Sequence, residues 1–154
     1  NIALSWLSEK LEMSYNWFDN IMIQRELQTD WFADLIEEYC EDRGINILGK
    51  SFKPETNITT GSPSILLKNI LEERGHGVFM WDPYIDESWE VIKQKYDDSD
   101  NETDSHLYFI GTKHPDFTDF PFEDGSIVLD PWRYIPKRKG IKVIHIGDSI
   151  NGTS

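Results

Sequence analysis

The residues best suited to bind a ligand lie in one segment, where lysines and hydroxyl side chains precede the start of a helix. Lys50 and Lys53 lie in the segment 49–63, and the Ser62-Pro63 pair is typical of a helix start. Backbone N–H groups at a helix start, together with lysine side chains, suit a phosphate or diphosphate. The segment has neither the Gly-x-Gly-x-x-Gly pattern nor the Walker lysine pattern. A loop that only connects a strand to a helix is therefore an equal alternative.

A second basic group stands out because the chain around it is acidic. Arg133 precedes a cluster of cations, which comprises Lys137, Arg138, Lys139 and Lys142. Arg133 also follows an expected strand, and ligands bind beyond the carboxyl ends of strands in parallel sheets. It either faces an anionic ligand or belongs to a solvated turn.

No pattern in the chain indicates a catalytic nucleophile or a metal site. Cys40 is the only cysteine, and the lack of a nearby histidine favours a packing role. Metal-ligand spacing is absent from the four histidines, which are His76, His106, His114 and His145. Asp82 precedes a proline, which favours a role in the turn that ends a strand. We therefore expect no catalytic and no metal-binding residue in this chain.

The charge and hydropathy of the chain disfavour several classes of partner. Its 154 residues include 15 lysines and arginines against 28 aspartates and glutamates, a formal net charge of −13. Nucleic acids and anionic membranes are bound by basic surfaces, and no apolar run is long enough to span a membrane. We therefore expect a soluble, cytoplasmic protein without nucleic-acid or membrane partners. The acidic stretch 97–104 is expected to be a surface loop.

Helical and extended patterns alternate along residues 44–154. Apolar spacing predicts two helices and five strands, the helices near 62–73 and 88–96 and the strands at 45–48, 78–81, 107–110, 127–129 and 143–146. Strands that alternate with helices form parallel sheets with right-handed crossovers. This region is therefore predicted to be an α/β, three-layer Rossmann-like domain with a mostly parallel five-stranded sheet.

Residues 1–43 are predicted to form a helical arm in front of that domain. Apolar residues recur at helical spacing over residues 2–11, and a longer helix follows over about 15–42. The longer helix is apolar on two sides, and its second side contains Trp17, Leu27 and Trp31. A lone surface helix needs only one such stripe. The second side packs either within its own domain or, as we favour, against a missing domain or a second subunit, and we expect a homodimer through this arm.

Several motifs occur together in an order that is specific to one family. The segment 45–56 reads Ile-Asn-Ile-Leu-Gly-Lys-Ser-Phe-Lys-Pro-Glu-Thr and is followed by Ser62-Pro63. Supporting matches are Met80-Trp81-Asp82-Pro83, Thr112-Lys113-His114-Pro115-Asp116-Phe117 and Asp130-Pro131-Trp132-Arg133. These motifs resemble the C-terminal, nucleotide-sugar-binding domain of the UDP-glucose/GDP-mannose dehydrogenase family. The arm resembles the end of that family's central dimerisation helix.

The resemblance implies part of an NAD-dependent enzyme, such as a UDP-glucose 6-dehydrogenase. Members of the family oxidise the C6 hydroxyl of a nucleotide sugar to a carboxylate in two hydride transfers. An N-terminal Rossmann domain binds their NAD, and a catalytic cysteine upstream of the matched region holds the sugar as a thioester. Neither feature lies in this chain, so we expect the chain alone to be inactive and to bind a UDP- or GDP-sugar but no cofactor.

The resemblance also implies which residues contact the substrate. Phe52 and Lys53 match the family's Phe-Lys pair, and Lys50 adds a positive charge beside them. Arg133 lies close to the position of a family arginine that contacts substrate. The competing hypothesis is a non-catalytic α/β nucleotide-binding or interaction module, similar to a receiver or flavodoxin-type domain.

Overall fold

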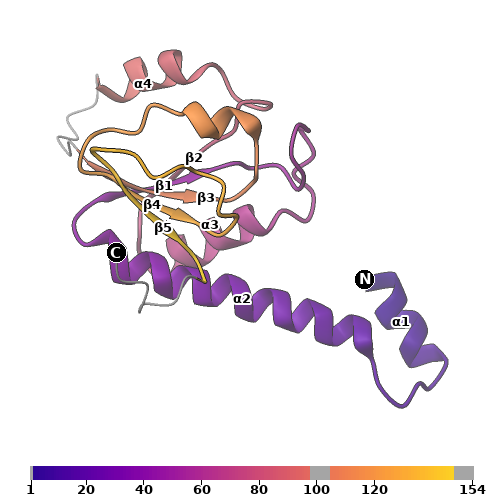
Figure 1. Ribbon diagram of the computed structural model, residues 1–154. Coiled ribbons are helices and arrows are strands. Elements are labelled where there is room, and N and C mark those ends of the chain that lie inside the picture. Colours follow the sequence, from indigo (N-terminus) through magenta and orange to yellow (C-terminus); the bar gives the residue numbers. More distant parts are fainter. Residues whose placement is uncertain (1, 98–104, 148–154) are drawn as a thin grey trace.

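The structure, a computed structural model, describes residues 2–97 and 105–147 (Figure 1). Its helices are α1 (Ile2–Lys10), α2 (Trp17–Cys40), α3 (Pro63–Glu73), α4 (Trp89–Asp97) and the short 3₁₀ helix η1 (Pro115–Asp119). Its strands are β1 (Gly44–Leu48), β2 (Val78–Trp81), β3 (His106–Ile110), β4 (Ile127–Asp130) and β5 (Lys142–His145). The acidic loop predicted at 97–104 lies outside the described residues from 98 onward.

The five strands form one parallel sheet in the order β2-β1-β3-β4-β5. Strand β1 lies between β2 and β3 and ends at Leu48, which lies opposite Trp81 on β2 and Ile110 on β3. The carboxyl ends of these three strands therefore lie level with one another. The predicted α/β class, the parallel five-stranded sheet and the helices that flank it are confirmed. The sequence analysis did not predict η1, whose five residues are too few for a helical period.

Alternate residues of each strand face two separate apolar layers. On β1, Ile45 and Ile47 pack towards α2 and α3, whereas Leu48 packs on the opposite side with η1 and the start of α4. Figure 1 shows α2 and α3 below the sheet and α4 above it. Both faces of the sheet are covered, which explains why the strands read as nearly continuous apolar runs.

The long helix α2 has two different halves. Its last turns lie in the core, where Ala33 and Ile36 are fully buried against the sheet and Cys40 is nearly so. Its first half extends past the sheet, with α1 packed beside its beginning (Figure 1), and Trp17 and Leu27 are 66% and 56% exposed. The predicted apolar stripe of this helix therefore divides into a packed half and an exposed half. Over residues 2–97 and 105–147, no helix has the length and apolar character needed to cross a membrane.

The division of α2 into a packed and an exposed half predicts that the same change, isoleucine to alanine, lowers the free energy of unfolding by different amounts in the two halves. Ile36→Ala removes a fully buried side chain and should lower the free energy of unfolding by about 2–5 kcal/mol. Ile21→Ala, on the exposed half of the same helix, should change it by less than about 0.5 kcal/mol. Urea unfolding of the two variants in dilute solution measures both values. Equal losses would show that the whole helix belongs to the core.

Candidate functional site

The strand ends β1 and β3 approach each other so closely that glycine is required on both. The connection after β1 leads towards α3 on one face of the sheet, and the connection after β3 leads to η1 on the other, so the two diverge there. A Cβ on Gly49, whose φ is +101°, would lie 2.6 Å from the Cβ of Thr112, and one on Gly111 would lie 3.0 Å from the carbonyl oxygen of Gly49 and 2.2 Å from the Oγ of Ser64 on α3. Ligands of open α/β folds bind where connections diverge in this way.

The carboxylate of Asp82 anchors the loop that follows β1. Asp82 is fully buried at the end of β2, and its Oδ2 accepts the backbone N–H groups of Lys50 at 2.7 Å and Ser51 at 3.0 Å. Its Oδ1 accepts the N–H of Tyr84 at 2.9 Å, which forms the turn that the sequence predicted. One side chain therefore closes its own turn and holds the neighbouring loop.

His114 supports the same loop from the end of β3. Its ring is fully buried, and its Nδ1 accepts the backbone N–H of Glu55 at 3.0 Å. Because Nδ1 acts as an acceptor, the proton of the neutral ring lies on Nε2. Nε2 is 3.1 Å from the Oδ2 of Asp82 and 2.9 Å from the Oγ of Ser51. The imidazole thus joins three connections that are distant in the sequence.

Burial and hydrogen bonding act in opposite directions on Asp82. Burial raises the pKa of its carboxyl, but the hydrogen bond from His114 and the three backbone N–H groups lower it further than burial raises it. The pKa of Asp82 therefore lies well below the usual range, and the carboxylate is ionised at neutral pH. The negative charge is what makes it a strong acceptor for several N–H groups at once.

Ser51, His114 and Asp82 are the residue types of a hydrolytic triad, but their geometry is different. In such a triad the serine and the aspartate bind opposite nitrogens of the ring. Here both contact Nε2, and the hydroxyl of Ser51 donates to the backbone carbonyl of Lys53 at 3.0 Å. The arrangement fixes a loop and does not activate a nucleophile.

The anchored loop exposes two of the four predicted contact residues. Phe52 is 47% exposed although its N–H donates to the carbonyl of Ile58 at 2.7 Å. Lys53 is exposed, and its ammonium has no acidic partner among the described residues. Lys50, in contrast, forms an ion pair of 2.6 Å with Asp86, so its charge is already partly neutralised within the loop anchor.

The fourth predicted residue, Arg133, lies on a turn built by Asp130. This buried carboxylate accepts the N–H groups of Trp132, Tyr134 and Ile135 at 2.5–2.9 Å. Arg133 is exposed at the top of the turn with a φ of +54°. Because β3 separates β4 from β1, Arg133 lies at the same edge of the sheet as the anchored loop but two strands away. Asp82 and Asp130 are both bound to backbone N–H groups, which makes neither suitable as a receiver's phospho-acceptor.

A cleft of about 370 Å³ lies between α2, the start of α3 and the ends of β3 and β4. Trp31 and Trp132 line it and are each about half exposed, and the indole Nε1 of Trp132 donates to the carbonyl of Ile110 at 3.0 Å. Nearby, the guanidinium of Arg25 donates to the carbonyl of Gly61 just before α3. The sequence analysis did not assign Arg25 to the site, because 36 residues separate it from its partner.

Cys40 has the environment of a packing residue. Its side chain is buried, and its Sγ contacts the carbonyl of Glu37 at 3.5 Å. Burial raises the pKa of the thiol, and the acidic residues around the end of α2 raise it further. A protonated, buried thiol is a poor nucleophile. Among the described residues, no His, Cys, Asp and Glu side chains are grouped so that they could hold a metal ion.

These features define a Rossmann-like domain, and open α/β sheets of this kind bind ligands at the carboxyl edge. Solved structures of two enzymes have the same fold. GDP-mannose dehydrogenase from Pseudomonas aeruginosa matches with a TM-score of 0.65 and 20% identity, over 92% of this chain and 36% of that chain. UDP-D-ManNAc dehydrogenase from Pyrococcus horikoshii matches with a TM-score of 0.51 and 21% identity, over 80% and 31%. The chain therefore spans about a third of the length of these enzymes.

The family itself is shown by the sequence match. Residues 46–137 match the UDP binding domain of the UDP-glucose/GDP-mannose dehydrogenase family, and the chain belongs to this family. The matched region begins in β1 and ends after the turn that carries Arg133. No curated protein sequence matches the chain. The family resemblance described from the motifs is thereby confirmed.

The buried anchor predicts the effect of neutralising Asp82. Asp82→Asn should lower the free energy of unfolding by about 3 kcal/mol, because buried N–H donors lose an ionised acceptor. The exposed Asp116→Asn is the matched control and should change stability by less than about 0.5 kcal/mol. Urea unfolding at pH 7 measures both values.

A comparison of wild type with Asp82→Asn at several pH values tests the direction of the pKa shift of Asp82. A carboxyl with a lowered folded-state pKa contributes its full stability above the unfolded-state pKa of about 3.9 and loses it as the pH falls towards the folded value. The stability difference between wild type and Asp82→Asn should therefore be constant above about pH 5 and shrink below pH 4. A difference that grows on acidification would contradict the lowered pKa.

Proposed function

We propose that this chain is the nucleotide-sugar-binding part of a cytoplasmic, NAD-dependent dehydrogenase that oxidises the C6 hydroxyl of a UDP- or GDP-sugar to a carboxylate in two steps. UDP-glucose 6-dehydrogenase is the form of this activity to test first. The observation that carries the proposal is the loop after β1, which belongs to the family-matched region and exposes Phe52 and Lys53 on a buried anchor. In this proposal Lys53 binds a phosphate and Phe52 packs against the sugar or the nucleoside.

The start of α3 supports the placement of the phosphates. Ser62 is the N-cap residue, but its hydroxyl makes no capping hydrogen bond and has no partner among the described residues. The first turn of α3 therefore keeps backbone N–H groups that the cap does not satisfy, and these attract anions. The guanidinium of Arg25 lies beside Gly61 at the same helix end. The N–H groups of α3 and the guanidinium of Arg25 therefore make the electrostatic potential positive around this helix start, although the chain as a whole is acidic.

The connection between β1 and α3 does not have the form of a main NAD site. The connection between β1 and α3 runs from Gly49 to Ser62 and lacks the tight glycine turn that holds a dinucleotide in Rossmann folds. We therefore propose that NAD and the catalytic cysteine belong to a part of the enzyme outside this chain, and that the chain alone is inactive. Hydride transfer is the chemistry that NAD supplies in such an enzyme.

Nucleotide binding is tested by titrating UDP, GDP and NAD separately into the ¹⁵N-labelled chain. We expect backbone amide shifts at residues 50–60 and around Arg133 with one of the two nucleoside diphosphates. Lys53→Ala should weaken that binding about tenfold, because it removes a charge-assisted contact to phosphate. Lys139→Ala, an exposed lysine elsewhere, is the matched control and should bind as wild type. Shifts with NAD alone would overturn the assignment.

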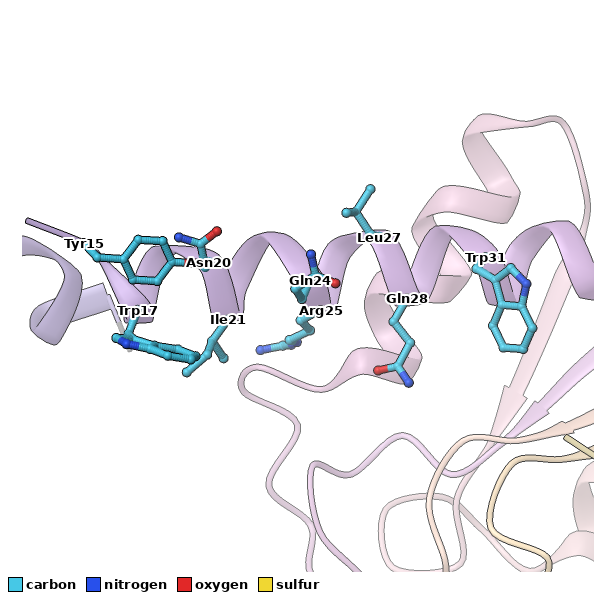
Figure 2. Close-up of a pocket in the computed structure, with 9 residues that line it drawn as sticks. All are labelled: Tyr15, Trp17, Asn20, Ile21, Gln24, Arg25, Leu27, Gln28 and Trp31. Carbon is cyan, nitrogen blue, oxygen red and sulfur yellow. The ribbon is translucent and has the colours of Figure 1, made fainter. Parts of the chain in front are cut away.

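We also propose that the exposed half of α2 forms a homodimer. Figure 2 shows Trp17, Ile21 and Gln28 projecting from one side of this half, whereas Leu27 projects from the other. Trp17, Leu27 and Trp31 are between 49% and 66% exposed, and an apolar surface of this extent on a soluble domain is typical of an interface. The hollow lined by Trp17 and Ile21 shares Gln28 and Trp31 with the cleft described above, so the proposed subunit contact and the proposed ligand site are adjacent.

The dimer proposal predicts that substitutions in the contact change the oligomeric state in solution. Light scattering of the wild-type chain should give a dimer at high concentration. A double variant, Trp17→Asp with Ile21→Asp on the same side of the helix, should give a monomer of unchanged fold, because two buried charges would oppose association. Glu38→Lys, an exposed change on the packed half of α2, is the control and should stay dimeric. A folded wild-type monomer at high concentration would contradict the proposal.

A further inference from the structure

We propose that His114 is a positioning residue: its imidazole holds the loop 50–55 in the shape that presents Phe52 and Lys53, so that ligand binding by this loop weakens when the contact between Nδ1 and the N–H of Glu55 is lost. The positioning follows from the geometry alone. The consequence for ligand binding rests on the proposed nucleotide-sugar function.

The two ring nitrogens of His114 contact different parts of the loop. Nδ1 accepts the N–H of Glu55, whose φ is +56°, and so holds the far end of the Phe52-Lys53 turn. Nε2 contacts Asp82 and Ser51 at the near end. The two exposed residues therefore lie between two points that one side chain fixes. Loss of the Nδ1 contact removes the hydrogen bond from His114 at the far end of the loop, whereas Asp82 still accepts the N–H groups of Lys50 and Ser51 at the near end.

Aromatic packing restricts the movement of the His114 ring. The phenol ring of Tyr84 stacks on His114, with 4.8 Å between ring centroids and 25° between planes, and Phe117 of η1 meets it edge-on at 5.4 Å. The ring is fully buried between them. Because the ring is held between these two aromatic partners, we expect a change at Nδ1 to be taken up by the loop.

The charges that face the ring come from three connections. Asp82 is the ionised group in contact with it, and the ion pair between Lys50 and Asp86 lies beside that carboxylate. The phenol of Tyr84 covers one face, and the carboxylates of Glu55 and Asp116 act on that phenol. A proton on Nδ1 would set an N–H donor against the N–H of Glu55. The contact would then become repulsive and the loop would move away.

Three substitutions separate the two nitrogens. In His114→Asn the amide oxygen can take the place of Nδ1 and still accept from Glu55, although the group cannot be protonated. In His114→Gln the amide nitrogen can take the place of Nε2 towards Asp82 and Ser51, but the acceptor for Glu55 is lost. His114→Ala removes both contacts. Tyr84→Phe keeps the stack and removes only an exposed hydroxyl, so it is the matched control.

The first readout needs no ligand. Imidazole ¹⁵N shifts of the wild-type chain at pH 7.5 should show Nδ1 without a proton and Nε2 with one. Amide hydrogen exchange at Glu55 should be about tenfold faster in His114→Ala and His114→Gln than in wild type, and close to wild type in His114→Asn and Tyr84→Phe. A proton on Nδ1 at that pH, or equal exchange at Glu55 in all variants, would overturn the positioning role.

The second readout uses UDP and GDP as probes at pH 7.5. His114→Gln and His114→Ala should bind the nucleotide about tenfold more weakly than wild type, whereas His114→Asn, which keeps the acceptor for Glu55, should bind close to wild type. Equal affinity in all variants would overturn the link between His114 and binding. If the wild-type chain binds neither nucleotide, the proposed function fails, whereas the ¹⁵N shifts and the exchange rates still decide the positioning role.

Discussion

The hydrogen bonds to the buried carboxylate of Asp82 are the constraint on which the carboxyl edge of the sheet depends. They join the ends of β1 and β2 and, through His114, the end of β3. A buried charge is costly unless several donors satisfy it, and here backbone N–H groups and one imidazole do so. The loop after β1 therefore has one favourable position, because any other position would leave this charge with fewer partners.

A rigid anchor below exposed side chains is a suitable design for a binding loop. Phe52 and Lys53 keep contact area and charge available at the surface, while the backbone beneath them is fixed before any ligand arrives. A loop that is ordered in advance loses less conformational entropy on binding. The net charge of −13 also gives local significance to the cations that lie at this edge, since the rest of the surface repels anions.

The helix α2 connects this edge of the sheet with an exposed apolar surface. Its packed half supplies Ile36 to the core, and its exposed half places Trp31 in the cleft and Arg25 at the start of α3. The chain spans about a third of the two dehydrogenases of similar fold. The chain has an open cleft and an exposed apolar helix surface at the same edge. Both features are expected of a domain that packs against other parts of a larger enzyme.

The sequence by itself determined the order of elements, the parallel α/β class, the family and the loop with Phe52 and Lys53, because these depend on local periodicity and on motifs that are contiguous along the chain. It also placed Asp82 in a turn, since that contact is local. Only the tertiary structure decided that Asp82, His114 and Ser51 meet and that Lys50 is paired with Asp86. These partners are 31 to 63 residues apart, and only the alignment of neighbouring strand ends in the folded sheet brings them into contact.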